Sequence, residues 1–303
     1  MTAFNVKSMC IYRMSRSMDL SSLSEQLEHF KYSPCGSQDL MKTGFIPPLG
    51  KHSDEIQHVA AGQHLISIMK ENKILPSAVI KSELQAKIDK LESEQHRRLK
   101  KTERDSLRDE VVHSLLPRAF SKYLRTDIWI NQEESLIIVL TASRRHAEDC
   151  LALLRKALGS LPVIPFATKE LPEMVMTDWV KNDELPNGFI FGEKAELKSL
   201  LGEGGIARFS NQDLISDDVL SNIDSGKMIT KLSLNYDDRI QFIITDDFVF
   251  TGIKFSDDIL DKNDDIDRED FAQRFDADFF LITSELKKLI TTTASAFGGE
   301  AKL

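Results

Sequence analysis

The sequence is poor in cysteine and has no long apolar run, and both absences narrow the classes of protein it can belong to. Its 303 residues include three cysteines, Cys10, Cys35 and Cys150, which lie far apart and outside any CxxC or Cys/His spacing. Such a set builds neither a disulfide framework nor a structural zinc site. The first residues lack the apolar stretch of a signal peptide, and no eighteen apolar residues run together. We therefore expect a protein of the reducing cytosol without a membrane segment.

The familiar ligand motifs are absent or incomplete. Glycines cluster at residues 202–205, but the GK[ST] that cradles phosphates is missing, so we interpret the cluster as a helix-ending turn. The acidic run at 261–272 has Asp and Asn at EF-hand offsets, yet Ile266 and Ala272 stand where Gly and Glu are required. Cys35 precedes His52 by seventeen residues, and an inert thiol is favoured over a nucleophile pair. We expect no cofactor, no bound metal and no catalytic residue.

What the chain does have is charge that is segregated along its length. The net charge is −9, which argues against a protein that binds DNA over its whole surface. Between residues 97 and 108, however, six Lys or Arg face only Glu103 and Asp105. Any contact with a polyanion would therefore be concentrated in this segment.

The same region, residues 76–120, has a helical pattern with two opposed stripes. The apolar stripe consists of Ile80, Leu84, Ile88, Leu91 and Leu99. The cationic stripe consists of Lys90, Arg97, Lys101, Arg104 and Arg108. A single helix would carry the cationic row over about 27 Å at ~1.5 Å per residue, although Thr102 and Asp105 resemble a capping box that would start a second helix. A solvated charged face is the simpler alternative.

The remaining pattern predicts an α+β fold with antiparallel or mixed sheets. We expect strands at 9–14 and 64–69, a β-hairpin at 128–141 and a meander at 228–234, 240–245 and 248–255. Helices are expected at 20–30, 147–158, 194–201 and 284–290, with a loop at 33–51. The proline-rich stretch 162–187 is the candidate boundary between lobes. The expected domains are a central lobe of residues 1–75 plus 120–165, a protruding long-helix arm at 76–119, and a C-terminal lobe at 166–303.

Five long segments resemble one known family, the bacterial recombination-associated protein RdgC. They are residues 33–39 (SPCGSQD), 73–81 (KILPSAVIK), 99–120 (LKKTERDSLRDEVVHSLLPRAF), 151–162 (LALLRKALGSLP) and 265–279 (DIDREDFAQRFDADF). The match extends through most of the chain. The first nine residues and the region 166–192 match poorly, and Ser210 and Asn211 stand where relatives carry lysines.

The resemblance implies a ring-forming homodimer that encircles duplex DNA without regard to sequence and limits access of the RecA recombinase. It implies a cytoplasmic, nucleoid-associated protein that binds single-stranded DNA more weakly, if at all, and no membrane. Phe120 matches the family's apolar contact at the interface that closes the ring. The expected DNA contacts are Arg97, Arg98, Lys100, Lys101, Arg104, Arg108, Arg118 and Gln212.

Two alternatives from other functional classes stay open. The acidic run could supply Asp264, Asp265, Asp267 and Glu269 to a Mg²⁺-dependent nuclease, whose metal ions need two or more carboxylates. The arm could instead bind a partner helix through its apolar residues Ile80, Leu84, Ile88 and Leu91, as a non-enzymatic scaffold.

Overall fold

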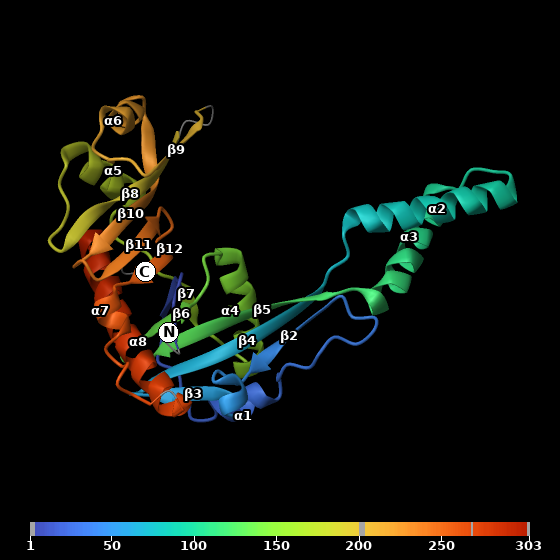
Figure 1. Ribbon diagram of the computed structural model, residues 1–303, viewed down its shortest axis with the longest axis horizontal. Coiled ribbons are helices and arrows are strands. Elements are labelled where there is room, and N and C mark those ends of the chain that lie inside the picture. The colour runs from blue at the N-terminus through green and yellow to red at the C-terminus, as the bar shows by residue number, and fades with distance from the viewer. Residues whose placement is uncertain (1–3, 200–203, 268, 302–303) are drawn as a thin grey trace.

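The computed structural model describes residues 4–199, 204–267 and 269–301, and these form two antiparallel sheets with helices packed on them (Figure 1). This confirms the predicted α+β class. Within the described residues, none of the helices is both long and apolar enough to span a bilayer.

The larger sheet has seven strands in the order β2-β4-β5-β6-β1-β7, with β3 paired to β4 on the same side as β2. Its long central pair, β4 and β5, is in register at eleven successive positions. The predicted strand at 9–14 and the hairpin at 128–141 are confirmed. The bounds are β1 Cys10–Met14, β2 Met41–Ile46, β3 Gln57–Ala60, β4 Gln63–Lys73, β5 Ser121–Asn131, β6 Leu136–Val139 and β7 Val163–Pro165.

Strand β2 corrects the predicted loop at 33–51. Gly44 was predicted to be a loop residue, but it lies inside β2. The backbone around Tyr32 passes directly over it. A Cβ atom at Gly44 would stand 2.4 Å from the Cα of Tyr32. The glycine therefore permits this close approach of two backbone segments. Beside it, the Tyr32 N–H donates to the Phe45 carbonyl at 2.8 Å.

Two helices, α1 (Leu23–Glu28) and α4 (Arg144–Leu158), pack on this sheet. Helix α4 begins where Ser143 caps it, its hydroxyl accepting from the His146 N–H at 3.3 Å, and it ends at Gly159 with φ of 74°. The predicted helix at 147–158 is thus confirmed, with one additional N-terminal turn.

The smaller sheet has five strands in the order β12-β11-β10-β8-β9. The predicted meander is confirmed by β10, β11 and β12, with the β10–β11 turn formed by Asp237 and Asp238 at positive φ. The bounds are β8 Phe189–Ser199, β9 Ile206–Ser210, β10 Lys227–Tyr236, β11 Ile240–Thr245 and β12 Phe250–Phe255.

Strand β8 shows that the helix predicted at 194–201 is wrong. Residues 200–201 lie outside the described residues, and up to Ser199 the segment is extended. Ala195 and Leu197 are buried in the core, and Lys194, Glu196 and Lys198, which alternate with them along the strand, lie on the other face. Tertiary pairing on both sides of β8 overrides the helix propensity of its Glu, Lys, Leu and Ala.

Helices α5 (Pro172–Asn182), α6 (Asp217–Asp224), α7 (Asp257–Leu260) and α8 (Phe271–Ala296) complete this part of the chain. The predicted terminal helix at 284–290 is confirmed as the middle of the much longer α8. The proline-rich stretch 162–187 is folded, since it contains β7 and α5. One hydrophobic cluster includes Leu65 and Trp129 of the larger sheet together with Phe242 and Phe279, so the core is continuous across both sheets.

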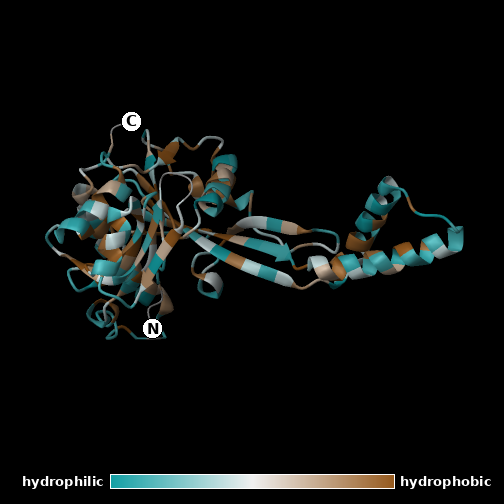
Figure 2. Cartoon of the chain, turned by 90° about the horizontal axis from the view of Figure 1, so that it is seen from above, coloured by the Kyte–Doolittle hydropathy of each residue, from teal (hydrophilic) through white to brown (hydrophobic). Residues whose placement is uncertain are grey.

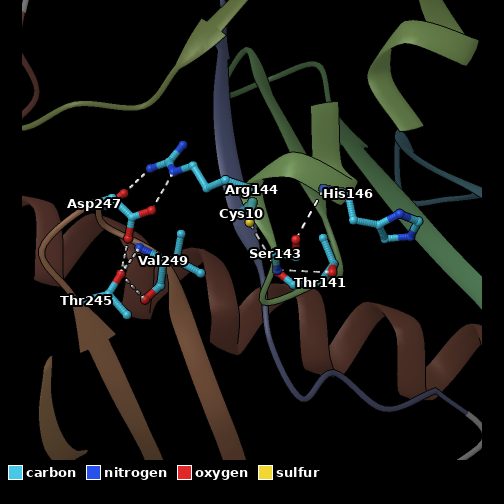
Figure 3. Close-up of polar contacts among 8 residues, drawn as sticks. All are labelled: Cys10, Thr141, Ser143, Arg144, His146, Thr245, Asp247 and Val249. Atoms are coloured by element: carbon cyan, nitrogen blue, oxygen red, sulfur yellow. Dashed lines mark hydrogen bonds and ion pairs between the residues drawn. The ribbon is translucent and has the colours of Figure 1, made fainter. Parts of the chain in front are cut away.

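An ion pair also ties the two sheets together (Figure 3). The Arg144 Nε at the start of α4 donates to Asp247 Oδ2 at 3.0 Å, and a second guanidinium nitrogen donates to the Asp247 carbonyl. Asp247 lies in the β11–β12 turn, where the Val249 N–H donates to Thr245 Oγ1 at 3.0 Å. Beside this pair, the backbones of Met9 and Phe250 exchange hydrogen bonds of 2.9 and 3.1 Å.

Strands β4 and β5 run beyond the body of the molecule and lead to two further helices (Figure 1). These are α2 (Ser77–Gln95) and α3 (Lys101–Leu115), followed by the 3₁₀ turn Leu116–Arg118. Together α2 and α3 form a helical hairpin that lies far from both hydrophobic cores. In Figure 2 hydrophilic residues cover most of both helices.

Candidate nucleic-acid interface

The helical hairpin turns between His96 and Lys100. His96 has a left-handed conformation with φ of 50°, which ends α2. The Lys100 N–H then donates to Glu103 Oε2 at 2.7 Å, which begins α3. Of the two possibilities that the sequence left open, the structure has the second helix and not one continuous helix, but the cap is at Lys100, two residues before the expected Thr102. The cationic residues bunch around the turn rather than form one straight row.

Two of the predicted contact residues are held by carboxylates of the hairpin itself. The Arg97 guanidinium contacts both oxygens of Glu103, at 2.6 and 2.9 Å, and this hydrogen bonding lowers the pKa of Glu103 to about 2. Arg104 Nη2 donates to Glu92 Oε1 at 3.1 Å, and Glu92 also accepts from the Leu99 N–H at 2.8 Å. These pairs fix the turn and neutralise part of the charge of Arg97 and Arg104.

Four other cations of the hairpin remain available, three of them at or next to the turn and Arg108 midway along α3. Arg98, Lys100, Lys101 and Arg108 are exposed, and none of them forms an ion pair with any residue that the structure describes. Arg118 is exposed as well, in the 3₁₀ turn at the base of the hairpin. A cluster of unpaired cations at the tip of a projecting element is suited to phosphate groups.

The apolar stripe of α2 is used inside the hairpin. Ile88 packs with Leu99 and Leu107 in a small core, and Leu84 and Leu91 border it. Ile80 is half-buried. A partner helix would therefore find most of this stripe already covered by α3, which weakens the scaffold alternative.

Phe120 lies at the opposite end of the hairpin, where β5 begins. Its side chain is 83% exposed, so it belongs to no hydrophobic core. Its carbonyl accepts from the Ile74 N–H at 2.7 Å, and Ile74 is itself 47% exposed. Ile74 and Phe120 thus lie opposite each other and make a small exposed apolar patch, a feature typical of protein–protein contacts.

A buried carboxylate beneath this patch escaped the sequence analysis. Glu71 on β4 accepts hydrogen bonds from Ser121 Oγ at 2.6 Å, Tyr32 Oη at 2.5 Å and the Cys35 N–H at 2.8 Å. These donors lower its pKa to about 2. The cluster fastens the loop after Tyr32 to the strands that carry the hairpin. No sequence signal marks it, because its members come from three distant segments.

Gln212 lies away from the hairpin, just after β9. Its side-chain amide donates to Ser216 Oγ at 3.1 Å and to Asp218 Oδ2 at 3.2 Å, at the start of α6. In this structure it therefore holds a loop, and the structure does not bring it together with the cations of the hairpin.

The acidic run is engaged in local structure. Asp264 pairs with the buried Arg274, Asp267 accepts from the Glu269 N–H at 3.0 Å, and Asp270 caps α8 by accepting from the Gln273 N–H. Among the described residues, no group of three or more His, Cys, Asp or Glu side chains is arranged to hold a metal ion.

The cysteines show no activated thiol. Burial raises the pKa of Cys10 to about 11 and that of Cys150 to about 12. Burial also raises the pKa of Cys35, which contacts Glu71, whereas the ring of His52 stacks on Phe271. The Cys35–His52 pairing is not formed.

Comparison with known proteins gives one consistent result. A sequence model of the family described as "Putative exonuclease, RdgC" matches residues 4–300. The recombination-associated protein RdgC of Yersinia enterocolitica is 53% identical over 298 residues, covering 98% of each chain. The protein of the same name from Serratia proteamaculans is also 53% identical, with the same coverage. The chain therefore belongs to the RdgC family of recombination-associated proteins.

Proposed function

We propose that the protein binds duplex DNA without regard to sequence, as a non-enzymatic homodimer that encircles the duplex and limits the access of RecA to it. The observation that carries this proposal is the set of exposed cations without ion pairs on the helical hairpin, with Arg98, Lys100 and Lys101 at its tip and Arg108 midway along α3, in a chain with a net charge of −9. Contacts of Lys and Arg with phosphates carry no sequence information, which accounts for binding that is indifferent to sequence.

The exposed apolar patch of Ile74 and Phe120 supports the homodimer. Exposed aromatic residues of this kind are common anchors of protein interfaces. A second copy that meets this patch would place two hairpins side by side and double the cationic surface. Four unpaired cations from each chain would then make about eight phosphate contacts, with a log–log salt slope near −7 at roughly −0.9 per contact.

The test is equilibrium binding of a labelled duplex of scrambled sequence at several salt concentrations. We expect a steep inverse dependence on salt for the native protein. The double variant Arg98→Glu and Lys101→Glu should weaken binding to all sequences alike, because it removes phosphate contacts and not base contacts. The matched control is Lys169→Glu with Lys181→Glu, two exposed lysines before and on α5. Equal binding by the two double variants would overturn the assignment of this surface.

The effect on RecA is tested separately. Adding the protein to a duplex before RecA should lower strand exchange in proportion to the occupied DNA. The Arg98→Glu and Lys101→Glu variant should restore exchange, since it no longer covers the duplex. If that variant inhibits as strongly as the native protein, the inhibition does not proceed through DNA occupancy.

The nuclease is retained as a second candidate, because the matching family description names an exonuclease. Its carboxylates would come from the acidic run, where Asp264 already pairs with Arg274 and Asp267 with the Glu269 N–H. Incubation of end-labelled single- and double-stranded DNA with Mg²⁺ or Mn²⁺ decides between the two. If the labelled DNA is shortened by the native protein but not by the Asp264→Asn, Asp267→Asn variant, the nuclease is established. If the DNA stays intact with the native protein, the nuclease hypothesis is rejected.

A further inference from the structure

The outer face of the five-stranded sheet carries a second concentration of positive charge. Its inner face packs in the hydrophobic core, with Ala195, Leu197 and Leu232 buried. On the outer face, cations come from every strand except β11. They are Lys194 and Lys198 on β8, Arg208 on β9, Lys231 on β10 and Lys254 on β12, which we call the basic sheet face.

A single buried carboxylate organises three of these cations. Glu196 is 7% exposed, and its oxygens contact Arg208 Nε at 2.8 Å, Lys198 Nζ at 3.2 Å and Lys231 Nζ at 3.3 Å. Burial opposes ionisation of Glu196, but hydrogen bonds from the three cations outweigh it and lower its pKa to about 2. One negative charge therefore fixes three positive ones, and the side chains of Arg208 and Lys231 remain 67% and 45% exposed. The group keeps a net positive charge in a fixed arrangement.

The other two lysines flank a hollow in the same face. The hollow encloses about 540 Å³, and its lining includes both Lys194 and Lys254. Neither lysine forms an ion pair with a residue in the described ranges 4–199, 204–267 and 269–301. Between them the hollow is lined by the uncharged amide side chains Asn211, Asn235 and Gln241, and Glu193 is its one acidic lining residue. Lysines and amides of this kind are common donors to phosphate and sugar oxygens.

The dimensions and charge of this face suit one occupant, the phosphate backbone of DNA. Arg208 and Lys254 lie on the two outermost strands, four strand intervals apart, which is about 19 Å at ~4.8 Å per interval. That distance is about half of the ~34 Å helical repeat of a duplex. A second copy of the same face is a poor occupant, because it would bring like charges together. In Figure 1, β9 and β12, the two edge strands of this sheet, lie nearer to the helical hairpin than α5 and α8 do.

We propose that the basic sheet face is a second DNA-contact surface, which holds the phosphate backbone of the same duplex that the helical hairpin contacts. This inference rests on the proposed function and deepens it. Gln212, two residues after the end of β9, is then next in the chain to Asn211, which lines the hollow.

The test uses the full-length protein and neutralises the two lysines that serve no ion pair. In the double variant Lys194→Gln and Lys254→Gln, the Glu196 cluster is untouched and the melting temperature should not change. The salt slope of duplex binding should become shallower by about 2 per chain, and affinity near 0.1 M salt should fall on the order of ten-fold or more. The control variant, Lys169→Gln with Lys181→Gln, changes the net charge by the same amount before and on α5. It should leave the salt slope of duplex binding unchanged.

The outcomes separate this inference from the function on which it rests. If the hairpin variant Arg98→Glu, Lys101→Glu loses affinity while the Lys194→Gln, Lys254→Gln variant matches its lysine control, the basic sheet face is not a DNA contact and duplex binding stands. If the native protein does not bind duplex at low salt, both proposals fall together. Loss of affinity and slope in the sheet variant alone would support the basic sheet face and remove the hairpin from the interface.

Discussion

Arg104 on α3 forms an ion pair of 3.1 Å with Glu92 on α2, and this contact joins the two helices of the hairpin next to their connection. Glu92 also accepts a hydrogen bond from the Leu99 N–H, so one carboxylate contacts both the turn and the second helix. The backbone hydrogen bond from Leu99 lowers the pKa of Glu92, with a further contribution from Arg104. Arg104, proposed from the sequence as a phosphate contact, thus also has a structural part in shaping the tip.

The small core of the hairpin should be essential to its shape. Leu107→Ala removes a side chain that is 8% exposed and packs on Ile88 and Leu99. We expect a loss of about 2 kcal/mol, at the low end of the range for buried leucines because this core is small. Hydrogen exchange resolved by segment measures it, with faster exchange confined to α2 and α3. Val79→Ala, at a side chain that is 43% exposed, is the control. Exchange rates equal in the two variants would contradict the prediction.

The proposed homodimer should depend on Phe120. Phe120→Ala removes an aromatic ring that is 83% exposed, so folding should be unaffected while self-association weakens by about 2 kcal/mol, or roughly thirty-fold in the dissociation constant. Sedimentation velocity over a range of concentrations gives that constant. Phe280→Ala, at a ring on α8 that is 54% exposed, is the matched control. Identical association of both variants would place the contact between subunits elsewhere.

The Glu71 cluster should make the base of the hairpin sensitive to acid. The pKa of Glu71 is about 2 in the folded protein and 4.5 in an unperturbed glutamate, so the folded state favours the ionised carboxylate. Its stabilising contribution is complete above pH 4.5 and is lost as the pH falls toward 2. Thermal unfolding followed between pH 6 and 3 should show this loss in the native protein. Glu71→Gln should be less stable at pH 6 and depend less on pH below 4.5. A parallel pH dependence of both proteins would show that the hydrogen bonds to Glu71 are not strong enough to depress its pKa.

Much of the fold follows from local patterns, and the misses have identifiable causes. The β10–β11–β12 meander was predicted from its β-branched and aromatic residues and from the turn residues Asp237 and Asp238. Helix α4 was predicted from its amphipathic pattern and from Gly159 at its end. β8 was predicted as a helix because its lysines, glutamates and alanine favour one, and only pairing with β9 and β10 makes it a strand. β2 was predicted as part of a loop because residues 33–51 are rich in Gly and Pro, although Gly44 lies in the strand, where it permits the close approach of Tyr32.

The candidate site divides in the same way. The cations between residues 97 and 108 are adjacent in sequence and were found, although their bunching at a turn was not foreseen. Phe120 was assigned to an interface by resemblance, and its exposure agrees with that prediction without testing it. The basic sheet face was missed because Lys194, Arg208, Lys231 and Lys254 come from four different strands. Only the register of the sheet, which places Glu196 between Lys231 and Arg208, brings such residues together.

The paired strands β4 and β5 give the molecule a mechanical property. Their eleven residue pairs span ten intervals, about 33 Å at ~3.3 Å per residue, from Asn131 in the body to Ser121 below the hairpin. A twisted ribbon that is hydrogen-bonded along its whole length moves as one piece. A tilt of about 5° at its Asn131 end would displace its far end by about 3 Å over that length. Small rearrangements around Trp129, deep in the core, would thus be amplified into movements of the distant tip.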